Sequence, residues 1–93
     1  MGTQAGIESL ARQINELQRQ TARAAEPVVE ENIRTRSDDA LQIEHTLDRL
    51  LDCACVPEGL VLFKALCRYY YALNPSAAAS YVNAYRELWE EDV

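Results

Sequence analysis

Two basic residues and a run of tyrosines form the most unusual chemical feature of this sequence. Lys64 and Arg68 stand four residues apart, and Arg68 is followed directly by Tyr69, Tyr70 and Tyr71. On a helix three consecutive side chains face three directions, so at most two of the rings can be buried. We expect Tyr71 to be exposed beside Lys64 and Arg68, where the ring and the two cations could hold a nucleotide or another small ligand. The competing interpretation is structural, with the rings packed at the rim of a bundle and their hydroxyls in water.

The acidic residues around the single histidine are a second candidate, for metal binding. His45 lies next to Glu44, and Asp48 and Asp52 follow at a spacing of four. A metal site needs several ligands that converge, and carboxylates in a row on one helix repel one another as readily as they share a cation. A di-iron bundle would carry the Glu-x-x-His pattern twice, and the sequence does not contain it. We therefore interpret the row as a solvated acidic face and expect no metal and no other cofactor.

The three cysteines lack the spacing of a metal or catalytic site. Cys53 and Cys55 are two residues apart and Cys67 stands alone, so there is no CxxC pair. A nucleophilic cysteine needs a base, and His45 lies two turns from Cys53 on the same predicted helix. Buried free cysteine commonly serves as a small apolar residue. Since the chain also has no phosphate-binding glycine loop and no Ser-His-Asp set, we expect no catalytic residues and no enzyme activity.

The net charge of the chain and its distribution limit the kinds of molecule that the protein can bind. The 93 residues fit a single domain, 1–93, with nine basic and fifteen acidic residues and a net charge of −6. Residues 1–36 carry five charges of each sign, whereas residues 37–93 carry four basic and ten acidic groups. This balance disfavours nucleic acid as a partner. The five arginines of the first third leave a DNA-binding patch as an alternative, although the glutamates between them favour a solvated helix face.

The chain is expected to be soluble and cytoplasmic. It has no run of about eighteen apolar residues that could span a membrane. The start, MGTQAGIES, lacks the basic and apolar regions of a secretion signal. Three cysteines without a framework spacing favour a reducing compartment.

The elements that position these residues are predicted to be helices throughout. Only three glycines and three prolines interrupt the chain, and no segment alternates as a strand does. The stretch 60–73 contains only two charges, which predicts a buried central helix over about 58–73. The apolar spacing over about 38–55 predicts a second helix, capped by Ser37, that forms a hairpin with the central one. A last helix follows Asn74.

The N-terminal region, residues 3–36, is predicted to be an amphipathic helix. Its apolar residues recur at alternating spacings of three and four and make a narrow seam, formed by Ile7, Leu10, Ile14 and Leu17. Such a seam could close on the protein's own core or on another chain. Pro27 should end or kink the helix, because proline lacks the amide donor and clashes with the preceding turn.

We therefore predict an all-α bundle of four to five helices, with a three-helix core over 38–90 and the amphipathic region over 3–36 wrapping it or reaching a partner. The predicted function is a small acidic protein-protein interaction module, an adaptor or inhibitor. It would bind through the seam to a helix of a second copy, forming a homo-oligomer, or to a helix of a different protein. The alternative is a small-ligand or nucleotide-binding protein that uses Lys64, Arg68 and Tyr71.

Overall fold

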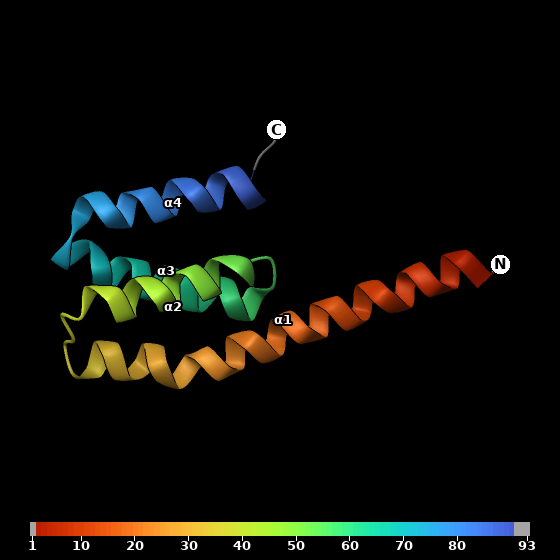
Figure 1. Ribbon diagram of the computed structural model, residues 1–93, viewed down its shortest axis with the longest axis horizontal. Helices are drawn as coiled ribbons and strands as arrows, with labels where there is room; N and C mark the ends of the chain where they lie inside the picture. Colours follow the sequence, from red (N-terminus) through yellow and green to blue (C-terminus); the bar gives the residue numbers. More distant parts are fainter. Residues whose placement is uncertain (1, 91–93) are drawn as a thin grey trace.

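Four helices make up the computed structural model, which describes residues 2–90, with side chains from residue 6 onward. They are α1 (Gly2–Arg34), α2 (Ala40–Asp52), α3 (Pro57–Leu73) and α4 (Pro75–Trp89), and Figure 1 shows them packed as a bundle from which one end of α1 projects. The described residues contain no strand, so the predicted all-α class is confirmed. α3 contacts each of the other three helices, as expected for a helix that is apolar around most of its circumference.

α1 consists of a packed half and a projecting arm, which we define as residues 2–18. Ala22, Ala25 and Val29 of the packed half are buried in the bundle, whereas the arm extends away from it (Figure 1). The helix continues through Pro27, and Figure 1 shows its axis curving between the packed half and the arm. Proline leaves one helical carbonyl without its donor, which is a common cause of bending. In the described part of the chain, no helix is both long and apolar enough to cross a membrane.

The core of the bundle is built from apolar side chains of all four helices. Its buried members are Ala22, Ala25, Val29, Ile43, Leu47, Leu50, Cys53, Phe63, Leu66, Cys67, Tyr70 and Ala78. α4 supplies only Ala78 to this set, with Tyr81 and Tyr85 half-buried beside it. The last helix therefore lies over the edge of the core, and the packed half of α1 shares the interior with α2 and α3.

Side-chain caps stabilise the starts of α2 and α4. Residues 35–39 link α1 to α2, and the Asp39 carboxylate caps α2 by accepting a hydrogen bond from the backbone N–H of Gln42 at 3.2 Å. The prediction of Ser37 as the cap was wrong. The Ser37 hydroxyl instead accepts from the Asp39 amide in the turn before the helix, which leaves the stronger acidic cap at the helix start. Asn74 caps α4, as predicted.

The turn between α2 and α3 brings two backbones into close contact. α3 begins at Pro57, so Gly59 lies in the first turn of the helix. A Cβ atom at Gly59 would lie 2.0 Å from the Cys53 carbonyl oxygen. Only glycine fits there, and its presence lets α3 start directly against the end of α2.

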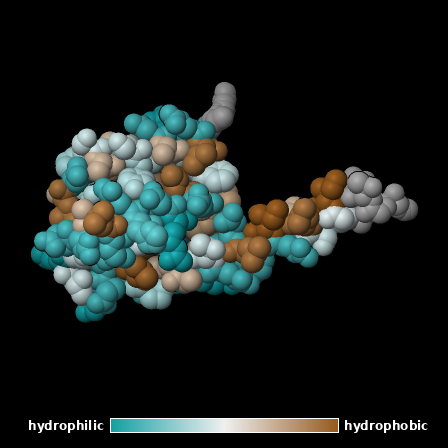
Figure 2. All heavy atoms as spheres, in the orientation of Figure 1, coloured by the Kyte–Doolittle hydropathy of each residue, from teal (hydrophilic) through white to brown (hydrophobic). Residues whose placement is uncertain are grey.

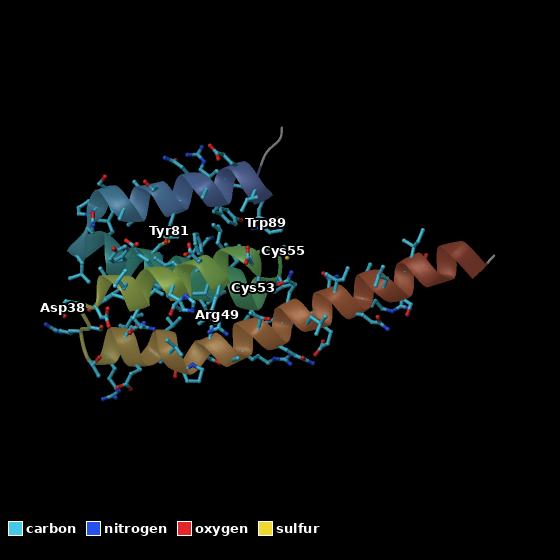
Figure 3. The ribbon with its side chains drawn as sticks, in the orientation of Figure 1. Asp38, Arg49, Cys53, Cys55, Tyr81 and Trp89 are labelled. Atoms are coloured by element: carbon cyan, nitrogen blue, oxygen red, sulfur yellow. The ribbon has the colours of Figure 1, made fainter. Side chains whose placement is uncertain are left out.

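Aromatic side chains with polar ends attach α3 and α4 to α2. The Tyr70 hydroxyl donates to the Glu44 carboxylate, and the Tyr81 hydroxyl donates to the Glu44 backbone carbonyl at 3.3 Å. The Trp89 indole N–H donates to the Leu51 carbonyl at 2.8 Å, and Figure 3 shows Tyr81 and Trp89 between α4 and α2. The expectation that Glu44 belongs to a solvated acidic face was therefore wrong, because its side chain is half-buried and bonded to a core tyrosine.

Candidate interaction site on the projecting arm

The seam lies exposed along the arm. The exposed fractions of its side chains are 63% for Ile7, 56% for Leu10, 48% for Ile14 and 61% for Leu17. Figure 2 shows these apolar side chains gathered along one side of the arm, beyond the body of the bundle. No residue from 6 to 18 is buried. In this structure the seam therefore does not close on the protein's own core.

The residues beside the seam determine what can pair with it. In a heptad labelled a to g, the two isoleucines of the seam occupy a positions and the two leucines occupy d positions. The flanking e and g positions between residues 6 and 18 are all uncharged: Gly6, Ala11, Gln13 and Gln18. The charged residues of this stretch occupy the outer positions b, c and f: Glu8, Arg12 and Glu16. A second copy of this helix could therefore pack on the seam without placing like charges opposite each other.

The line of the seam continues past the arm. Thr21, half-buried, and Ala24, exposed, follow Leu17 at the same alternating spacing. The buried residues of α1, such as Ala22 and Val29, lie on a different side of the helix. The bundle therefore leaves the continuation of the seam partly open.

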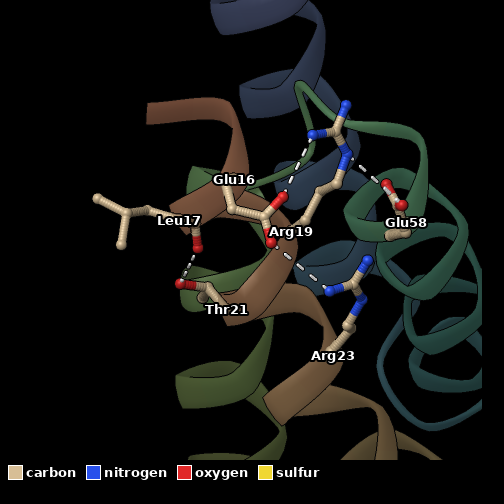
Figure 4. Close-up of polar contacts among 6 residues, drawn as sticks. All are labelled: Glu16, Leu17, Arg19, Thr21, Arg23 and Glu58. Carbon is tan, nitrogen blue, oxygen red and sulfur yellow. Dashed lines mark hydrogen bonds and ion pairs between the residues drawn. The ribbon is translucent and has the colours of Figure 1, made fainter. Parts of the chain in front are cut away.

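Among the described residues, three of the five N-terminal arginines pair with carboxylates: Arg19, Arg23 and Arg34. Arg19 lies 3.6 Å from Glu16 and 3.6 Å from Glu58 on α3, and Arg23 lies 3.7 Å from Glu16. Figure 4 shows this cluster on one side of α1, with Leu17 pointing away from it. Exposed pairs of this kind add little stability, but they offset positive charge that a DNA-binding patch would need. The arrangement therefore favours the seam over the arginines as the interaction site of α1.

The second predicted site lies on an open groove between α3 and α4. Lys64, Arg68 and Tyr71 all line this groove, which has a volume of about 680 Å³. Tyr71 is the exposed member of the tyrosine run, as expected, at 59%. The opposite wall comes from α4 and its C-cap residue Glu90 and was not assigned from the sequence. Its α4 members are Ala78, Ala79, Val82, Asn83, Tyr85 and Arg86. The sequence of α4 does not show which of its faces meets α3, so only the helix packing could place these residues.

The buried cysteines are poor candidates for reactive groups. Burial raises the pKa of the Cys67 thiol to about 11, and burial is also the main cause that raises the pKa of Cys53. Thiols that stay protonated at neutral pH are weak nucleophiles and weak metal ligands. His45 is exposed. Within the described residues, no three His, Cys, Asp or Glu side chains are grouped to hold a metal ion.

Comparison with known proteins finds no match to this chain among family models, curated proteins or solved structures. We therefore infer its function from the arm and the bundle themselves.

Proposed function

We propose that this protein is a small interaction module that dimerises through its arm, with the seams of two copies packed as a two-stranded coiled coil. The observation that carries the proposal is the exposure of all four seam side chains on a helix where none of the described residues covers them. Fully burying an apolar side chain of this size gains about 1.5–3 kcal/mol. A contiguous apolar surface on an otherwise polar helix is typical of an interaction site.

The residue types around the seam support a second copy as the partner. Isoleucine at a positions with leucine at d positions favours two strands over three or four. The uncharged e and g positions remove the like-charge repulsion that a symmetric pair would otherwise suffer.

We propose that the two arms run parallel. In a parallel pair both chains extend in the same direction from Leu17, so the contact can continue along Thr21 and Ala24. In an antiparallel pair those two small residues would lie opposite residues that precede Ile7, and residues 2–6 contain no large apolar side chain.

A dimer of this kind suits an adaptor or inhibitor role. The coiled coil of the two arms would hold two bundles together. The acidic surface of each bundle would repel other acidic proteins and so select among targets. The free thiols of Cys53, Cys55 and Cys67 are consistent with a reducing, cytoplasmic setting.

Light scattering over a dilution series tests the proposal. The unmodified protein should have twice the mass of one chain at micromolar concentration. Leu10→Glu combined with Leu17→Glu should weaken the dimer at least about 100-fold, equivalent to about 3 kcal/mol, because four carboxylates would enter the apolar contact. Ser9→Glu combined with Asn15→Glu adds the same charge outside the seam and should leave the dimer intact. A monomer at all concentrations, or a dimer in the seam variant, would contradict the proposal.

Disulfide trapping tests the orientation. In a Cys55→Ser background, Leu17→Cys should form a disulfide between two chains, because position 17 faces its own copy in a parallel pair. In an antiparallel pair position 17 would face position 7 of the partner, so the two introduced thiols would lie about 15 Å apart along the helix, too far for a disulfide. Efficient dimerisation without cross-linking would show that the arms are antiparallel.

A further inference from the structure

The basic residues of the bundle gather at the groove between α3 and α4. Between residues 37 and 90 the chain has four basic side chains, and three of them, Lys64, Arg68 and Arg86, line this groove. The same stretch has eight acidic side chains, of which only Glu90 lines the groove. Local positive charge on a protein whose net charge is −6 marks a place where an anion is attracted.

The basic side chains of α3 are available to a ligand. Among the described residues neither Lys64 nor Arg68 forms an ion pair, and the two stand one helical turn apart. Arg86 faces them from α4 and lies 3.7 Å from Glu90, in a contact between exposed side chains. Such exposed pairs are weak, so Arg86 can exchange its partner for a ligand at little cost.

The floor of the groove is apolar. Phe63, Cys67 and Ala78 are buried there, and the Tyr85 ring packs on Phe63 with the ring centroids 5.7 Å apart. Ala78 and Ala79 carry small side chains on α4, so the two helices leave space between them. The volume of about 680 Å³ lies within the range of small-molecule sites, about 300–1,000 Å³.

We propose that this groove binds an acyl carboxylate, with the alkyl chain on the apolar floor and the carboxylate on Lys64, Arg68 and Arg86. Arginine can hold a carboxylate through two parallel hydrogen bonds, which fixes the charged end of the ligand. The buried floor, formed by Phe63, Cys67 and Ala78, is apolar and fits an alkyl chain. The Asn83 amide also lines the groove, but it lies exposed on α4 and not on this floor, so the floor favours an alkyl chain over a nucleotide base. This site is separate from the seam and does not depend on dimerisation.

Calorimetric titration with octanoate tests the proposal, with 1-octanol and AMP titrated in parallel. Octanoate should bind one molecule per chain with a submillimolar dissociation constant, and both comparison ligands at least 10-fold more weakly. Equal binding of 1-octanol would overturn the role of the basic rim. Binding of AMP in preference to octanoate would overturn the acyl chain as the ligand and favour a nucleotide.

Matched variants locate the site. Lys64→Glu combined with Arg68→Glu should weaken octanoate binding at least 10-fold, whereas Arg12→Glu combined with Arg36→Glu makes the same charge change elsewhere and should not. Ala79→Phe should fill the groove and weaken binding at least 10-fold, whereas Ser80→Phe, on the neighbouring exposed position, should not.

The seam is the other apolar surface that an alkyl chain could occupy. Octanoate binding should therefore be retained in the Leu10→Glu, Leu17→Glu variant. Binding that is lost in this seam variant but unchanged in both groove variants would overturn the proposal, and it would leave the dimer proposal untouched.

Discussion

The arm and the bundle contain the same kind of apolar helix surface in two different environments. Leu47 and Leu50 on α2 are fully buried, whereas Leu10 and Leu17 on the arm are more than half exposed. All four belong to stripes with the same helical spacing, so periodicity does not distinguish them. The difference comes from length: α1 has 33 residues, or about 50 Å, and the 13 to 17 residues of the other helices cover only about half of it. An amphipathic pattern shows that an apolar helix face must be buried, but it does not show whether the same chain or another chain buries it.

Gly59 and Gly6 both lie inside helices, and substitutions at these two positions should differ most in their effect on stability. Gly59→Ala should destabilise the bundle by more than about 4 kcal/mol, because the new Cβ would lie 2.0 Å from the Cys53 carbonyl oxygen. At Gly6 an added Cβ meets no atom within 4 Å, so Gly6→Ala should stabilise the arm helix by up to about 1 kcal/mol. Thermal denaturation followed by circular dichroism measures both changes. Similar effects at the two positions would contradict the close contact at Gly59.

Alanine substitutions of one buried leucine and one exposed leucine test the difference between the bundle and the arm. Leu47→Ala should lower the free energy of unfolding by about 2–5 kcal/mol, because it opens a cavity at a fully buried site. Leu10→Ala should change it by less than about 0.5 kcal/mol when the protein is dilute enough to be monomeric. Urea denaturation provides the measurement. A large loss from Leu10→Ala in the monomer would show that the arm folds back on the bundle.

Alkaline pH should destabilise the bundle through its buried thiols, Cys53 and Cys67, because burial raises the pKa of both. Burial raises the pKa of Cys67 from 9.0 to about 11, so the native state keeps a proton that the unfolded chain releases. The contribution of Cys67 to stability is complete below pH 9 and is lost as the pH rises to about 11, a change of about 2–3 kcal/mol. The hydrogen bond to Glu44 raises the pKa of Tyr70 and burial raises that of Tyr81, so further loss follows above pH 10.

Urea midpoints between pH 7 and 11 measure this dependence. Cys67→Ala should flatten the decline between pH 9 and 11, whereas Cys55→Ala, at an exposed position, should leave it unchanged. An equally steep decline in the Cys67→Ala protein would assign the effect to other groups.

The smallest expected effect concerns the contact between α2 and α3. Glu44→Ala should cost about 1–3 kcal/mol, because the Tyr70 hydroxyl, in a side chain that is 1% exposed, loses its acceptor. Adding Tyr70→Phe removes the stranded hydroxyl and should recover part of the loss. Asp52→Ala, at an exposed position on the same helix, is the control. Additive losses in the double variant would show that the hydrogen bond contributes little.

The sequence predicted the features that depend on one helix at a time. The low charge of 60–73 indicated a central helix, and three tyrosines in succession required that one of them, Tyr71, be exposed. The all-α class follows from the same local signals, because few glycines and prolines interrupt the apolar periodicity.

The features that were missed depend on how helices cross. Glu44 is spaced like a solvated carboxylate, but Tyr70 and Tyr81 reach it from α3 and α4. The α4 wall of the groove was missed for the same reason, since Arg86 lines the same groove as the basic residues of α3 only because the two helices pack together. The cap of α2 lies at Asp39, two residues after the predicted Ser37. Serine and aspartate can both accept a hydrogen bond from a backbone N–H at the start of a helix, so the residue type alone did not distinguish them.

The contact between α4 and α2 also provides an intrinsic fluorescence probe. The chain has a single tryptophan, and the indole N–H of Trp89 is bonded to the Leu51 carbonyl, so its emission reports whether the last helix is docked. The arm contains no aromatic residue, so pairing of two arms places no chromophore in the contact. Fluorescence can therefore follow the opening of the bundle while scattered light follows assembly, in the same unlabelled sample.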